Sequence, residues 1–201
     1  GFALDDERLK NLGGGGYFKE LLERIRDIRA SEKVFYRQVL EIYATSIDYD
    51  PKAEISVHFF KKVQNKIHYA IHGQTAAEVI YNRADAEKEF MGLTTFAGNQ
   101  PTLREATIAK NYLNEPEMRN LNEIVTMYLD YAERQARRGN VMYMADWVKR
   151  LDAFLQFNEE DILHDKGKVI AAIAKAFAEK EFEKFRVLQD RTYQSDFDRL
   201  V

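Results

Sequence analysis

Two histidines, His68 and His72, stand four residues apart in a segment with helical periodicity. Residues at this spacing share one face of a helix, so both imidazoles can point at one ligand, as metal-binding histidines do. The zinc motif HExxH needs a glutamate directly after the first histidine, and Tyr69 stands there instead. A hydrogen-bonding role at the edge of the core explains the pair equally well. We therefore predict no metal centre and no cofactor.

Other polar residues could line a pocket around the two histidines. Each has an ordinary structural explanation, because Thr75 and Glu78 have the spacing of a capping box and Lys and Asn are common near helix C-termini. Convergence of these side chains in one cleft would indicate an enzyme of unknown reaction, whereas separate capping roles would argue against one. The candidate pocket residues are Asn65, His68, His72, Glu78, Lys110 and Asn111.

Composition excludes several classes of function. The chain has no cysteine, which rules out disulfides and thiol catalysis, and its formal net charge is −3. A net negative charge gives no general basis for nucleic-acid binding. One compact basic cluster, Arg134, Arg137 and Arg138, is a candidate nucleic-acid contact. Basic residues near a helix C-terminus are also expected from the helix dipole.

A run of glycines at residues 13–16 precedes the first strong helical pattern. A phosphate-binding loop is excluded, because no Lys-Ser or Lys-Thr follows the glycines and no strand pattern precedes them. We expect a lead-in and glycine linker over residues 1–16 and a single helical domain over residues 17–201. The chain starts without Met, and its start reads as the middle of a longer protein.

Apolar residues recur in steps of three and four from Phe18 to Ile42, which is a heptad pattern with Glu32 as its polar interruption. This pattern predicts one helix from Tyr17 to about Thr45, spanning about 40 Å. Such a helix would leave part of its apolar face exposed in a monomer, so we predict a homodimer. The alternative is that the C-terminal helix folds back over this face. The predicted interface residues are Phe18, Leu21, Ile25 and Ile28.

The remaining chain also has helical periodicity, with only 3 prolines and no convincing strand pattern. The predicted fold is all-α, a bundle of about seven helices with a long N-terminal heptad-bearing helix and a long C-terminal helix. No apolar run approaches the roughly 20 residues that a membrane helix requires. We expect a cytoplasmic protein. The C-terminal helix is expected to bury a stripe formed by Ile170, Ile173, Phe177, Phe182, Phe185 and Leu188.

Long phrases of the sequence extend from one end to the other: GFALDDERL at 1–9, YFKELLERIRDIRASE at 17–32, SIDYDP at 46–51, HGQTAAE at 72–78, IVTMYLDYAE at 124–133, LDAFLQFN at 151–158 and FRVLQDR at 185–191. Together they resemble the virulence RhuM family of bacterial proteins. The resemblance implies a C-terminal region that follows a DNA-binding or phage-antirepressor-like segment, which this chain lacks. It implies no reaction and supplies no catalytic residues.

Two hypotheses from different classes follow. The favoured one is a non-enzymatic helical oligomerisation or interaction module of a DNA-associated, virulence-related or phage-related regulator. It would form homodimers or bind a protein partner, with DNA contacted by the absent N-terminal segment more than by this chain. The rival is an enzyme whose polar pocket surrounds His68, His72 and Glu78.

Overall fold

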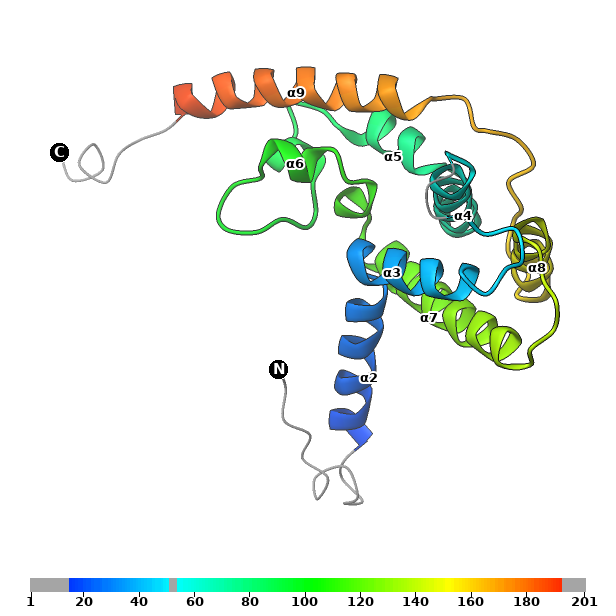
Figure 1. The fold of residues 1–201 in the computed structure, drawn as a ribbon. Helices are drawn as coiled ribbons and strands as arrows, with labels where there is room; N and C mark the ends of the chain where they lie inside the picture. The colour runs from blue at the N-terminus through cyan, green and yellow to red at the C-terminus, as the bar shows by residue number, and fades with distance from the viewer. Residues whose placement is uncertain (1–14, 51–53, 193–201) are drawn as a thin grey trace. The chain divides into compact units, whose positions relative to one another are not determined.

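Every regular element of the computed structural model is a helix across residues 15–50 and 54–192, which are the residues that the structure describes (Figure 1). This confirms the all-α prediction for that part of the chain. Two short 3-10 helices, η1 (Glu89–Gly92) and η2 (Ala109–Tyr112), accompany the α-helices. The α-helices are α2 (Gly15–Arg29), α3 (Glu32–Tyr43), α4 (Glu54–His72), α5 (Ala76–Arg83), α6 (Leu103–Ala106), α7 (Glu115–Arg137), α8 (Met144–Phe157) and α9 (Ala171–Thr192).

The chain divides into two compact units. Unit 1 joins the chain up to Phe60 with Arg119–Phe154, and unit 2 joins Lys61–Met118 with the chain from Leu155 onward. The single helical domain expected over residues 17–201 stays a prediction. Residues 1–14 of the expected lead-in lie outside the described residues. The last two glycines of the run begin α2 and are not part of a linker.

In unit 1, the long helix predicted from Tyr17 to about Thr45 is divided into α2 and α3. The break falls at Ser31, whose backbone is extended, with φ −61° and ψ 137°. The Ser31 hydroxyl donates a hydrogen bond to the carbonyl oxygen of Ile28 at 2.7 Å. Serine side chains compete in this way with the helical hydrogen bonds of the backbone, which favours a helix end. The prediction of one continuous helix was therefore wrong.

The core of unit 1 joins α3, α7 and α8 through three aromatic side chains. Tyr43, Tyr128 and Trp147 are at most 1 % exposed. The hydroxyls of Tyr43 and Tyr128 are hydrogen-bonded at 2.8 Å, and Trp147 Nε1 donates to Ser46 Oγ at 3.0 Å. These bonds satisfy the polar atoms of large buried side chains, so α3 is held firmly against α7.

In unit 2, α5 and α9 lie side by side (Figure 1). The buried face of α9 contains Ala174 and Ala178, which are at most 1 % exposed, while Ile173 is 52 % exposed. Small side chains let two helices approach closely, which apolar periodicity alone does not reveal. The expected stripe was therefore only partly right, because Phe185 is buried but Ile170, Ile173 and Leu188 are exposed.

Among the described residues, no helix combines the length and the apolar character that crossing a bilayer requires.

Candidate functional site

Helix α4 of unit 2 places His68 and His72 on one face. Nδ1 of His68 and Nε2 of His72 are 3.2 Å apart, so one ring donates a hydrogen bond to the other. His68 is buried, and burial lowers its pKa to about 3, with further lowering by His72, Lys110 and Arg83. Burial and the charge of Arg83 also lower the pKa of His72. At neutral pH His68 is therefore uncharged.

An ion pair between Arg83 and Glu117 lies within electrostatic reach of the histidines. Arg83 donates to both carboxylate oxygens of Glu117, at 2.6 and 2.7 Å, and to the carbonyl oxygen of Tyr112 at 2.9 Å. Glu117 also accepts from the backbone N–H of Asn114 at 2.9 Å. The hydrogen bonds from Arg83 are the main cause that lowers the pKa of Glu117 to about 2.

Three of the candidate pocket residues have structural roles in unit 2. Asn65 Oδ1 accepts from the backbone N–H of Ala76 at 3.4 Å, and Asn111 Nδ2 donates to the carbonyl oxygen of Glu105 at 3.0 Å. Glu78 accepts from the backbone N–H groups of Thr75 at 2.7 Å and of Lys168 at 2.6 Å. These hydrogen bonds cap α5 and fix the segment that precedes α9.

The structure therefore brings His68, His72 and the charge of Lys110 together with Arg83 and Glu117, while Asn65, Glu78 and Asn111 bond to the backbone. In the described part of the chain, no three His, Asp or Glu side chains are grouped so as to hold a metal ion. The sequence did not predict the pairing of Arg83 with Glu117. No local signal connects these two, because they are 34 residues apart.

Helix α2 of unit 1 carries the predicted interface residues. Leu21 and Ile25 are half-buried and Ile28 is 44 % exposed. The side chain of Phe18 lies outside the described residues. None of the α2 side chains described, from Lys19 to Arg29, is buried.

Polar contacts hold α2 to α7. Arg26 pairs with Glu123 and Arg29 pairs with Asp130, each at 2.8 Å. All four side chains are at least 22 % exposed. Ion pairs that remain partly exposed to solvent contribute little to stability, so α2 is held to the rest of unit 1 less firmly than α3.

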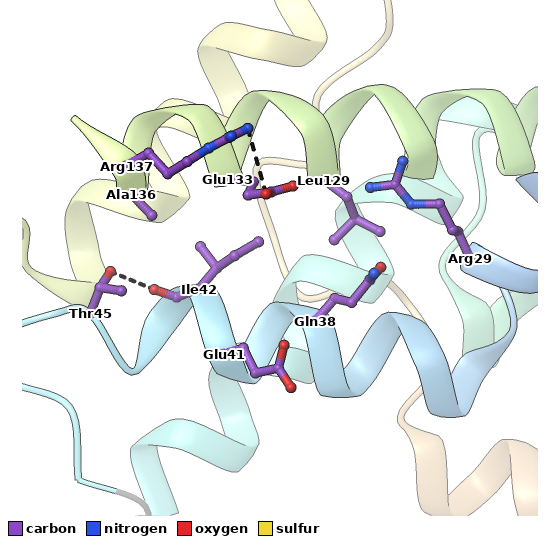
Figure 2. Close-up of a pocket in the computed structure, with 9 residues that line it drawn as sticks. All are labelled: Arg29, Gln38, Glu41, Ile42, Thr45, Leu129, Glu133, Ala136 and Arg137. Carbon is purple, nitrogen blue, oxygen red and sulfur yellow. Dashed lines mark hydrogen bonds and ion pairs between the residues drawn. The ribbon is translucent and has the colours of Figure 1, made fainter. Parts of the chain in front are cut away.

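A groove of about 450 Å³ lies between α3 and α7 (Figure 2). Ile42 and Leu129, both buried, form its apolar floor together with Ala136. In Figure 2, Arg29 lies at one end, and Thr45 and Arg137 lie at the other. Gln38 Oε1 is buried at the groove without a hydrogen-bond partner in the structure. The groove is lined by Arg29, Gln38, Glu41, Ile42, Thr45, Leu129, Glu133, Ala136 and Arg137.

The basic cluster Arg134, Arg137 and Arg138 is exposed at the C-terminal end of α7. Arg137 pairs with Glu133 at 3.5 Å, one turn earlier on the helix. No carboxylate of the described residues pairs with Arg134 or Arg138. Nucleic-acid contact through this cluster remains a proposal.

Comparison with known proteins gives a family for the chain. No curated protein and no solved structure matched it. The sequence profile of the Virulence protein RhuM family matches residues 1–194, almost the full length. This match confirms the resemblance that the quoted phrases indicate. The chain therefore belongs to the Virulence protein RhuM family.

Proposed function

We propose that the chain is a non-enzymatic helical assembly module of a RhuM-family protein, and that α2 joins two copies of it. The observation that carries this proposal is the exposure of α2. Four apolar residues, Leu21, Leu22, Ile25 and Ile28, lie within eight residues of one helix, and none is buried in the single chain. Full burial of one such side chain stabilises by about 1.5–3 kcal/mol, so a stripe that the single chain covers only in part favours association.

A second copy is the simplest cover for this stripe. Closed two-fold contacts are the commonest form of protein self-association, and heptad patterns such as the one in α2 are typical of helix pairing. In a longer protein, the module would hold two copies of a DNA-contacting segment together. That arrangement would suit a cytoplasmic bacterial regulator, and its support is the family resemblance.

The enzyme hypothesis has weaker support. Among its candidate residues, Asn65, Glu78 and Asn111 are engaged with backbone groups. His68 and His72 bond to each other. We therefore favour assembly over catalysis.

Substitution of an exposed α2 residue tests the proposal without disturbing the core. Ile28→Asp should raise the dissociation constant of the dimer at least about tenfold, equivalent to about 1.4 kcal/mol, because it places a charge within the apolar contact. The matched control is Leu103→Asp in unit 2, since Leu103 is 43 % exposed and Ile28 is 44 % exposed. Light scattering coupled to size-exclusion chromatography gives the mass, and circular dichroism verifies folding. A monomeric unmodified chain at high concentration would refute the proposal.

A further inference from the structure

We propose that the groove between α3 and α7 receives helix α2 of a second copy of this chain. This inference rests on the proposed self-association and adds the surface that α2 binds. Three features of unit 1 support it: matching lengths, an apolar floor and complementary charges.

The lengths agree. The apolar stripe of α2 extends from Leu21 to Ile28, and the α3 side of the groove extends from Gln38 to Thr45. The stripe spans two helical turns, about 10 Å, and the α3 side covers the same number of residues, although α3 itself ends at Tyr43. The α7 side runs from Leu129 to Arg137 and is slightly longer. A third helix can therefore lie along the groove for the full length of its stripe.

The floor of the groove is apolar where the stripe would lie. Ile42 and Leu129 form the floor, and half-buried Ala136 lies near the end at Arg137. Leu21 and Ile28 would contact this floor as alternate turns of α2 pass over it. The small side chain of Ala136 leaves room for a large residue opposite.

The charges fix a direction. Glu41 is exposed at the groove, and no cation of the described residues pairs with it. Arg24 is exposed on α2 between Leu21 and Ile28, and it too has no carboxylate partner within the described chain. With Arg24 opposite Glu41, Glu20 would lie toward the end of the groove at Thr45 and Arg137 when α2 runs antiparallel to α3.

The same charges disfavour nucleic acid as the occupant. Glu41 and Glu133 both line the groove, and their carboxylates would oppose phosphate groups laid along it. A protein helix that carries both signs of charge fits this lining better.

The absence of native cysteine permits a direct test by disulfide crosslinking. Two full-length variants are prepared with different tags, Arg24→Cys and Glu41→Cys, then mixed, equilibrated and oxidised. A disulfide forms only when the two Cβ atoms come within about 4.5 Å. The expected product is a mixed dimer that links position 24 of one chain to position 41 of the other. The control is Leu103→Cys in unit 2, which gives the background of disulfides that form by random collision.

Each outcome decides the proposal. A dominant 24–41 product supports it, whereas a dominant product between two Arg24→Cys chains means that α2 pairs with α2, which overturns the groove but keeps the assembly function. A dimer in light scattering that gives no 24–41 product also overturns the groove. A monomer in light scattering overturns both proposals. A short DNA duplex that suppresses the 24–41 product by occupying the groove would assign it to nucleic acid.

Charge reversal provides an independent check. Glu41→Arg and Arg24→Glu should each raise the dissociation constant about tenfold, because like charges then meet in the interface. The double variant restores the opposite pair and should recover most of the affinity. Equal losses that simply add in the double variant would contradict the predicted contact.

Discussion

Arg83 and Glu117 form a bidentate ion pair in which Arg83 also donates to the carbonyl oxygen of Tyr112. Glu117 is at the same time the capping residue of α7, since it accepts from the backbone of Asn114. One carboxylate thus fixes both the end of α5, where Arg83 lies, and the start of α7. Removal of the Glu117 carboxylate should therefore destabilise unit 2 more than a typical surface substitution does.

Glu117→Gln should destabilise the protein by about 1.5–3 kcal/mol, because it leaves Arg83 without its charged partner. Urea denaturation at pH 7 measures the change in the free energy of unfolding. The control is Glu179→Gln, whose pair with Lys175 spans 3.8 Å between side chains 66 % and 42 % exposed. That pair should contribute under about 1 kcal/mol. Equal effects of the two substitutions would contradict the importance of the Arg83 contact.

The carboxylate of Glu117 also makes the stability of the protein depend on pH in the acid range. The pKa of Glu117 is about 2 in the folded state and near 4.5 for the free group. The unfolded chain therefore takes up the proton first, so this contribution is complete above pH 4.5 and is lost as the pH falls toward 2. Glu117→Gln should flatten the stability profile between these values. Thermal melts at intervals of pH provide the measurement.

Burial of His68 makes the stability of the protein depend on pH over a higher range. The pKa of His68 is about 3 when folded and 6.5 when free, so below pH 6.5 the unfolded state binds more protons. Stability should fall as the pH drops from 6.5 toward 3. His68→Gln keeps a hydrogen-bonding side chain but removes this titration, and should reduce the slope. His164→Gln is the control, since His164 is exposed. An unchanged slope in His68→Gln would contradict the burial of that ring.

Gly167 is close to the cap of α5. A Cβ there would lie 2.7 Å from Thr75 Cγ2, and its φ of +78° is already unfavourable for other residues. Gly98 has a similar φ of +72° but open space around it. Gly98→Ala should cost about 1 kcal/mol from the backbone alone. Gly167→Ala should cost about 1–3 kcal/mol more from crowding. The difference between the two variants in the free energy of unfolding, measured by urea denaturation, gives the contribution of crowding. Equal losses of stability would show that the Thr75 side chain moves aside.

Chelation should leave the melting temperature unchanged. His68 and His72 use ring nitrogens to bond each other, and no metal-binding group of three His, Asp or Glu side chains exists in the described part of the chain. Differential scanning fluorimetry with and without a chelator measures this. A marked fall that zinc reverses would make the two histidines metal ligands instead.

Local signals in the sequence predicted the features that depend on neighbouring residues. The capping box Thr75–Glu78 is confirmed, and His68 and His72, four residues apart, lie on one face of α4. These features need only helical geometry and one turn of chain.

Features that depend on distant residues were missed. The partner of Glu117 is Arg83, on another helix, and no pattern within a helix identifies it. The buried face of α9 uses Ala174 and Ala178, because close helix approach depends on side-chain volume as well as hydrophobicity. The break between α2 and α3 at Ser31 is local, but it involves a side-chain hydrogen bond to Ile28 that the apolar period does not reveal.

Helix α2 is joined to α7 by the partly exposed pairs Arg26–Glu123 and Arg29–Asp130, without a buried apolar anchor among its described side chains. Attraction between such charges is screened by dissolved ions over about 10 Å at 0.1 M salt, whereas burial of apolar surface is not weakened in this way. Added salt should therefore weaken both the hold of α2 on its own chain and the Arg24–Glu41 contact, while leaving the burial of the apolar stripe in the groove largely unchanged. The ionic strength of the solution would then regulate how readily α2 leaves its own chain and binds the groove of another.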